Sequence, residues 1–228
     1  NHEIDKNGRE LITSQIIPTR GTWLEFETDA RDVLYVRIDR TRKVTLTTLL
    51  RAFGLSSDDE ILAMFGEDDY LKNTIAKDST KNTDEALIEI YEKLRPGEPA
   101  TLDSAKNQLI TRFFDEFRYD LAKVGRYKFN RKLDVCERLI NCKIAETIKV
   151  DGKVVVEDGT LITKELLEEL KPIFASGYGK KKVLINEELD SYDYVQVVKV
   201  YSNNNPEKVV SIIGNDQDID AKRLTISD

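Results

Sequence analysis

Histidine, cysteine and tryptophan are scarce in this chain of 228 residues, which has one histidine, two cysteines and one tryptophan. His2 is the single imidazole, so catalysis that uses histidine as a nucleophile or general base has almost no candidates. Cys136 and Cys142 are too far apart for a CxxC pair, and this argues against a structural zinc site. So few thiols fit a reducing, cytoplasmic setting.

Long apolar runs and phosphate-binding loops are missing as well. No stretch approaches the roughly 20 apolar residues of a membrane span and no signal peptide is visible, so no membrane partner is expected. The loop Gly177-Tyr178-Gly179-Lys180 faintly resembles a Walker motif, but Phe174 and Lys181 stand where that motif needs Gly and Ser or Thr. No cofactor is therefore expected on this chain. Its abrupt start at Asn1 suggests a piece of a longer protein.

The charged residues of the chain are unevenly distributed along the sequence. The net charge of -7 argues against general coating of nucleic acid, so any contact with DNA must be local and oriented. Two basic clusters nevertheless stand out, one between residues 35 and 53 with five basic residues and one acid, the other between 118 and 132 with six and one. Each lies beside aromatic residues. Local positive fields on an acidic body predict that a polyanion binds at a defined face.

The first part of the chain predicts β-hairpins followed by helices. Asn7-Gly8 is a hairpin turn dipeptide, and residues 23–28 and 33–39 alternate as an antiparallel hairpin with one apolar face. If the second strand continues, Arg40 and Arg42 share a face. Helices are expected at 45–53, 57–65, 69–77, 82–94 and 101–114, three of them opened by N-terminal capping signals at Ser57, Asn82 and Thr101.

From about residue 134 the pattern predicts a small β-rich module with one helix. Asp151-Gly152 is a type I′ turn between two short strands, and Thr163 caps an amphipathic helix to about residue 173. Further strands are expected at 182–185, 194–201 and 208–213. The chain thus reads as an α+β protein with two domains, 1–133 and 134–228.

Trp23 has two interpretations at this point. A lone tryptophan at a strand start is usually a core residue. With guanidinium groups nearby, it could instead be a platform on which an unpaired base stacks, a contact that contributes roughly 1–3 kcal/mol per base. The basic residues Arg37, Arg40, Arg42 and Lys43 could equally be the charges that protect a solvated strand edge.

Five separated motifs occur in an order that resembles the lobe domain of the bacterial DNA-directed RNA polymerase beta subunit. They are IIPTRGTWLEFE, VRIDRTRK, LRPGEPAT, RFFDEFRYDL and VGRYKFNRKL. The resemblance is dense over residues 10–133. Residues 134–228 resemble the lineage-specific β–β′ module insertions of this lobe, which are small sandwich-barrel hybrids.

The resemblance implies a role in transcription, in which the lobe forms one wall of the DNA cleft and touches the non-template strand and the downstream duplex. It implies five DNA-binding residues: Trp23, Asp39, Arg40, Arg95 and Arg118. The implied partners are DNA and the alpha, beta-prime and sigma subunits, and the catalytic magnesium of this nucleotidyltransferase is held by beta-prime. The D-I-D-H-L-G-N-R motif that completes the base pocket is absent, and Thr41 stands where the family often has another basic residue.

Two other functions stay open. Residues 134–228 could be a docking module for a transcription factor or another subunit, because β-hairpins offer edges for strand addition; they could equally be a filler without a partner. An autonomous enzyme is disfavoured, since nothing in the sequence supplies histidine, phosphate or metal chemistry.

Overall fold

The computed structural model describes residues 1–184, 192–215, 217–225 and 228. The described residues form two compact units, each built from segments that are distant in the sequence. Unit 1 contains Asn1–Leu62, Asp69–Gly125 and Ala221–Leu224, and unit 2 contains Ala63–Asp68, Arg126–Asp220 and Thr225–Asp228. The chain crosses between the units several times, and the crossing that begins the longest segment of unit 2 lies between Gly125 and Arg126, within one helix.

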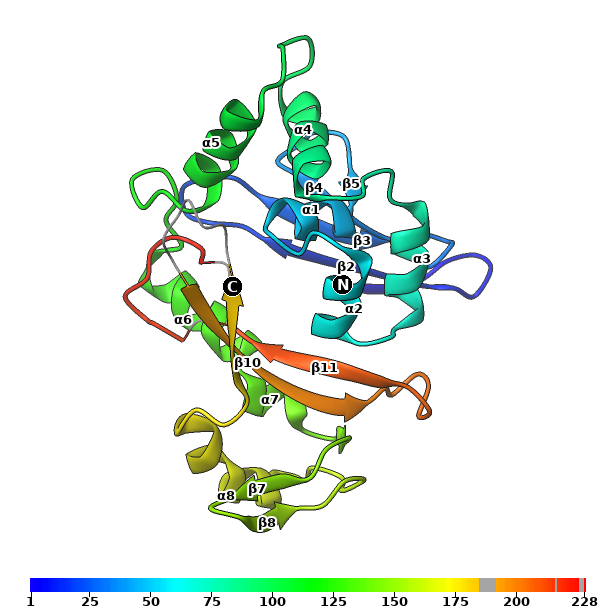
Figure 1. Cartoon of the computed structure of the whole chain (residues 1–228), viewed down its shortest axis with the longest axis vertical. Coiled ribbons are helices and arrows are strands. Elements are labelled where there is room, and N and C mark those ends of the chain that lie inside the picture. Colours follow the sequence, from blue (N-terminus) through cyan, green and yellow to red (C-terminus); the bar gives the residue numbers. More distant parts are fainter. Residues whose placement is uncertain (185–191, 216, 226–227) are drawn as a thin grey trace. The chain divides into compact units, whose positions relative to one another are not determined.

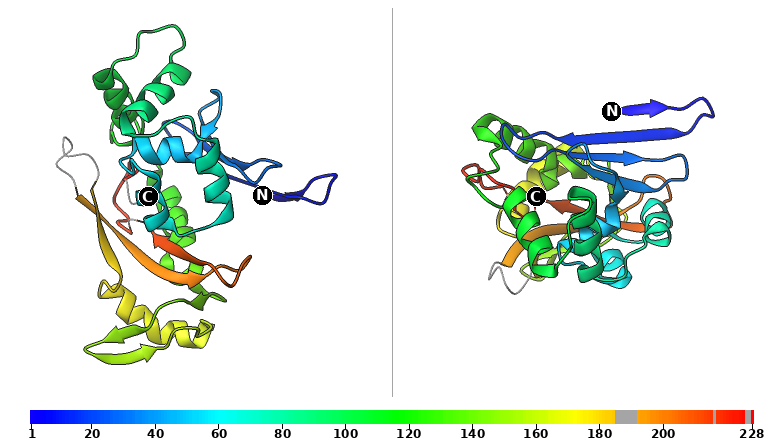
Figure 2. Two further views of the ribbon diagram at one scale, coloured as in Figure 1. Left: turned by 45° about the vertical axis from the view of Figure 1, so that its right-hand side comes forward. Right: turned by 90° about the horizontal axis from the view of Figure 1, so that it is seen from above.

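Unit 1 is built on a five-stranded antiparallel sheet in which the strands lie in chain order. Its strands are β1 (His2–Ile4), β2 (Glu10–Ile16), β3 (Leu24–Thr28), β4 (Leu34–Ile38) and β5 (Val44–Thr45). The β1–β2 hairpin lies at one edge of this sheet (Figure 2). Both predicted hairpins are confirmed, and the whole meander needs only short turns because every neighbour pair is antiparallel.

The β3–β4 hairpin has the apolar face that the alternation predicts. Val36 and Ile38 are buried, whereas Tyr35 and Arg37 on the other face are partly exposed. The strand does not continue past Ile38, because Asp39 has a φ of 52°, in the left-handed region. Arg40 and Arg42 therefore do not share a strand face.

Helices follow the sheet in unit 1, and their starts are confirmed at all three capping signals. The helices are α1 (Leu46–Ala52), α2 (Asp58–Phe65), α3 (Asp69–Lys77), α4 (Thr83–Leu94) and α5 (Leu102–Phe113). Ser57 and Glu60 form a reciprocal capping box. The side chains of Asn82 and Thr101 accept hydrogen bonds from backbone N–H groups in the first turns of α4 and α5.

Successive layers of helices cover the sheet of unit 1 (Figure 1). Helices α1 and α3 contact β4, α4 contacts α1, and α5 contacts α4. The α4–α5 pair therefore lies in the outer layer, joined by the turn that contains Pro96 and Gly97. An outer helical pair exposes one face to solvent, and this face forms part of the candidate site.

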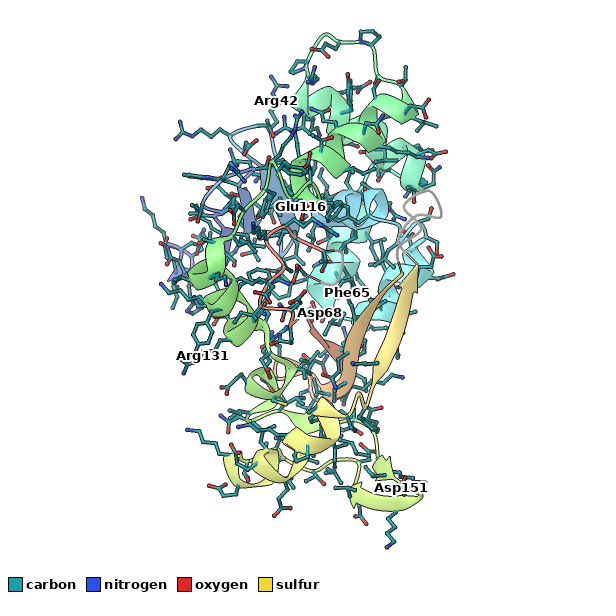
Figure 3. The ribbon with its side chains drawn as sticks, turned by 90° about the vertical axis from the view of Figure 1, so that its left-hand side faces the viewer. Arg42, Phe65, Asp68, Glu116, Arg131 and Asp151 are labelled. Carbon is teal, nitrogen blue, oxygen red and sulfur yellow. The ribbon has the colours of Figure 1, made fainter. Side chains whose placement is uncertain are left out.

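Helix α6 (Ala122–Leu133) is an element that apolar periodicity does not predict. Its buried side chains are polar: Arg126, which pairs with Asp228, and Asn130, which accepts a hydrogen bond from Asn215. The basic residues of the second cluster thus lie mostly along one helix, and the side chain of Arg131 points outward from it (Figure 3).

Unit 2 contains most of α6, and the part of it that follows α6 is β-rich with one long helix, as predicted. Its elements are α7 (Val135–Leu139), β6 (Lys143–Ile144), β7 (Ile148–Val150), β8 (Lys153–Val156), α8 (Lys164–Ala175), β9 (Lys180–Leu184), β10 (Tyr192–Tyr201) and β11 (Val209–Gly214). Strands β6, β9, β10 and β11 form one sheet, and β7 and β8 form a separate hairpin. The predicted strand at 182–185 corresponds to β9, and its last residue lies outside the described part of the chain.

The predicted turn and helix of unit 2 are confirmed. Asp151 and Gly152 have φ values of 50° and 78°, as a type I′ turn requires, and Asp151 lies at the tip of the hairpin (Figure 3). Thr163 accepts a hydrogen bond from the N–H of Leu166 and so caps α8. In both units, no described helix is long and apolar enough to cross a bilayer.

Candidate nucleic-acid interface

The first and fourth motifs are joined by a backbone bridge in unit 1. The N–H of Arg20 donates to the carbonyl of Asp120 at 3.1 Å, and the N–H of Asp120 donates back to Arg20 at 2.7 Å. Gly21 follows with a φ of 128°, and a Cβ on it would lie 2.7 Å from the ring of Tyr119. Only glycine allows this approach, which places the backbone before Trp23 directly against the loop that carries Arg118.

Asp39 joins the second motif to the first. The N–H of Trp23 donates to Oδ1 of Asp39 at 2.9 Å, and the N–H of Asp39 donates to the carbonyl of Trp23 at 2.8 Å. The other carboxylate oxygen, Oδ2, accepts a hydrogen bond from Arg112 of α5 at 2.8 Å. A single carboxylate therefore fixes the backbone of Trp23 and one arginine of the outer helix, which gives Asp39 a positioning role.

These contacts surround a cleft with a volume of about 600 Å³. Its lining residues are Gly21, Thr22, Tyr91, Arg95, Ser104, Asn107, Gln108, Thr111, Arg112 and Arg118. The volume lies within the roughly 300–1,000 Å³ that is usual for ligand sites. Three guanidinium groups in one cleft are suited to phosphate, because each offers several donors in a planar fork.

One wall of the cleft is a polar stripe along α5. Residues 104, 107, 108, 111 and 112 recur at helical spacing and line the cleft, while Ala105, Leu109 and Phe113 are buried. An amphipathic helix thus directs its apolar side inward and its polar side to the cleft. None of these polar residues belongs to the motifs of the sequence, although the same periodicity that predicts the helix also groups them.

Each arginine in the cleft is oriented by a carboxylate. Arg112 pairs with Asp39 as described, Arg95 donates to Glu98 at 3.1 Å, and Arg118 lies 3.6 Å from Asp115. Arg95 and Arg118 are at least half exposed, whereas Arg112 is 28% exposed at its side chain. Surface pairs of this kind contribute little to stability, so the exposed two remain available to an anion.

The five residues implied by the family resemblance are partly brought together. Arg95 and Arg118 line the cleft. Asp39 is not a lining residue, but it accepts a hydrogen bond from the lining residue Arg112. Trp23 follows the lining residue Thr22 and keeps 40% of its surface exposed, so the interpretation as a buried core residue is wrong. Arg40 is exposed in the turn after β4 and does not belong to the described lining of the cleft.

The two cysteine thiols, Cys136 and Cys142 of unit 2, are poor candidates for a reactive site. Burial raises the pKa of both thiols, that of Cys136 to about 11, so both stay protonated near neutral pH. Protonated thiols are poor nucleophiles and metal ligands. Within the described ranges, no group of three or more His, Cys, Asp or Glu side chains could hold a metal ion.

Comparison with known proteins agrees with the motifs. Residues 1–147 match the family model described as RNA polymerase Rpb2, domain 2. The chain is 52% identical to the DNA-directed RNA polymerase subunit beta of Geobacillus thermodenitrificans over 93% of its length, and 50% identical to that of Staphylococcus aureus over its whole length. It spans only 18% and 20% of those two proteins. The resemblance to the beta-subunit lobe is confirmed, and the chain belongs to the RNA polymerase Rpb2, domain 2 family.

Proposed function

We propose that the cleft and Trp23 form a binding surface for a single strand of DNA within a bacterial RNA polymerase. The strand is the non-template strand, held near the downstream duplex in the cytoplasmic enzyme. One observation carries the proposal: the loop of Trp23, the exposed guanidinium groups of Arg95 and Arg118, and the polar stripe of α5 converge on one cleft. Exposed aromatic rings combined with cations along a groove bind unpaired bases and their phosphates, and the backbone of Trp23 is linked to Arg112 of the cleft through Asp39.

The contribution of this surface is placement rather than bond making. An exposed indole stacks on a base of any sequence, and the arginines neutralise phosphates and release counterions. The chemistry of nucleotide addition, with its magnesium ion, belongs under this proposal to the beta-prime partner, and the alpha and sigma subunits complete the assembly. The surface holds the opened strand so that the two strands stay apart.

Trp23 offers a direct test because it is the only tryptophan. Its fluorescence is followed while the 228-residue chain is titrated with a 12-nucleotide single strand and, separately, with the matching duplex. The single strand should quench the emission and the duplex should not. Anisotropy of labelled DNA then compares variants, and Trp23→Ala should weaken binding about fivefold or more, from the roughly 1–3 kcal/mol that stacking contributes.

Arg118→Ala and Arg95→Ala should weaken the same binding, since each removes a phosphate contact. Arg31→Ala is the matched control: Arg31 is exposed and lies in the turn at the far end of the β3–β4 hairpin from Trp23. Equal binding by the parent chain, Trp23→Ala and Arg118→Ala would contradict the proposal. So would an equal loss in Arg31→Ala, because that result would indicate a diffuse charge effect.

A second candidate concerns residues 134–228 as a lineage-specific docking module for another polymerase subunit or a transcription factor. The observation that favours it is exposed apolar surface. Val154 and Val155 of β8 are 51% and 40% exposed, and Leu161, which follows β8 in the sequence, is 53% exposed. Exposed apolar surface often marks a protein contact. Purified beta-prime and sigma should bind the chain less well after Val154→Lys, and unchanged binding of both would contradict this function.

A further inference from the structure

Gln108 is the residue of the cleft whose hydrogen-bonding capacity is unused. It lies on the polar stripe of α5 among the lining residues. Both amide atoms, Oε1 and Nε2, are covered from solvent and have no hydrogen-bond partner among the described residues. A buried amide without partners costs roughly 1–3 kcal/mol, so such a group calls for an explanation.

The three arginines of the cleft differ from Gln108 in this respect. The guanidinium groups of Arg95, Arg112 and Arg118 each have a carboxylate beside them. Those cations supply charge but only donors, so they recognise phosphate or a base edge with two acceptors. Gln108 supplies one acceptor and two donors side by side, and it is one of the residues that line the cleft.

We propose that Gln108 reads the base of the bound strand by pairing with the N6 amino group of adenine and an adjacent ring nitrogen. Glutamine pairs with adenine in duplex DNA through the N6 amino group and the adjacent ring nitrogen N7. An unpaired adenine also exposes N1 on the other side of N6, so it offers the matching donor and acceptor on two edges. This inference rests on the proposed function, because it requires a single strand in the cleft.

The substitution Gln108→Leu distinguishes base recognition by the amide from an effect on the stability of the fold. Leucine removes the unsatisfied amide while keeping similar bulk, so the chain should be at least as stable to urea as the parent. The probes are two labelled 12-nucleotide strands, one of deoxyadenosine and one carrying purine without the N6 amino group. The two strands have the same charge and closely similar stacking surfaces, so they differ mainly in the bidentate contact.

The parent chain should bind the adenine strand about five- to tenfold more tightly than the purine strand, within the 1–3 kcal/mol of a good bidentate pair. In Gln108→Leu the affinities for the adenine strand and for the purine strand should become equal, and both should lie near the parent chain's affinity for the purine strand. Asn107→Leu, a change of a neighbouring lining amide, should keep the adenine preference.

The outcomes distinguish the two proposals. An unchanged adenine preference in Gln108→Leu, or no preference in the parent chain, would overturn base reading by Gln108 while leaving strand binding intact. If neither strand binds, or if Arg118→Ala and Trp23→Ala bind both strands as well as the parent does, the proposed function itself fails.

Discussion

At the scale of single residues, charge is used in two opposite ways in unit 1. Arg51 and Asp78 are fully buried and surrounded by threonine hydroxyls, whereas Arg95 and Arg118 are exposed at the cleft. A buried pair must satisfy its hydrogen bonds internally, and here the hydroxyls of Thr47 and Thr80 donate to Asp78. The buried arginine therefore serves the fold, and only the exposed arginines are available for a ligand.

Asp78 gives the clearest prediction for stability. Burial alone would raise its pKa, but hydrogen bonds from Thr47, Thr80 and Arg51 outweigh that effect and lower the pKa below its ordinary value. A carboxylate with a depressed folded-state pKa stabilises the fold above its unfolded pKa of about 3.9, and this contribution is lost as pH falls further through the folded pKa. Asp78→Asn should therefore flatten the acid limb of the stability profile.

At pH 7 the same substitution should lower the free energy of unfolding by about 3 kcal/mol, near the lower end for a broken buried pair, because Arg51 keeps its contact with Asp58. Urea unfolding measured from pH 3 to pH 7 checks both effects. Asp58→Asn is the control, since the Asp58 side chain is 47% exposed. Equal effects of the two substitutions would contradict the special role of Asp78.

At the scale of elements, the helices differ in how closely the sequence predicts them. Helices with apolar periodicity and capping residues, such as α4 and α8, are predicted closely from the sequence. Helix α6 is not, because its buried positions Arg126 and Asn130 are polar and find their partners about 90 residues away, at Asp218 and Asn215. Local patterns hold no information about such distant partners.

The candidate site was only partly predictable, because part of it also depends on contacts between distant segments. The motif arginines Arg95 and Arg118, and Trp23 as the proposed stacking residue, could be named from the resemblance. The stripe that includes Gln108 could not be assigned to a cleft, since its opposite wall comes from the loop at Gly21 and from the Arg118 loop. Tertiary contacts between loops, and not the periods of single elements, create that wall.

The bridge between those loops depends on Gly21, and this yields a prediction for the element. Gly21→Ala places a Cβ 2.7 Å from the Tyr119 ring and 3.2 Å from the Arg118 carbonyl, at a φ that side chains rarely adopt. The free energy of unfolding should fall by about 1–3 kcal/mol, and affinity for single-stranded DNA should fall with it because the cleft wall shifts. Urea unfolding and Trp23 emission measure the two effects.

Gly97→Ala is the matched control for Gly21→Ala. Gly97 also has a positive φ, of 87°, but open space surrounds the position where a Cβ would lie. It should therefore show only backbone strain, of about 1 kcal/mol. If Gly21→Ala is no worse than Gly97→Ala in either measurement, the close approach to Tyr119 does not hold the cleft wall.

At the scale of the whole molecule, the net charge of -7 opposes the approach of DNA. Binding must then depend on a few local cations, which predicts a shallow dependence on salt. Counterion release from a single strand gives a slope of log K against log salt of about -0.7 for each neutralised phosphate. Two or three arginines at the cleft therefore predict a slope of about -1.4 to -2.1.

Anisotropy titrations of a 12-nucleotide strand between 50 and 200 mM salt measure this slope. Affinity should fall about 7- to 20-fold over that range, and Arg118→Ala should make the slope shallower by about 0.7. Arg31→Ala, on the turn remote from Trp23 along the β3–β4 hairpin, should leave the slope unchanged. A much steeper slope that both substitutions reduce alike would mean that DNA coats the charged surface at large. In an oriented site, the loss of Arg118 changes the slope and the loss of Arg31 does not.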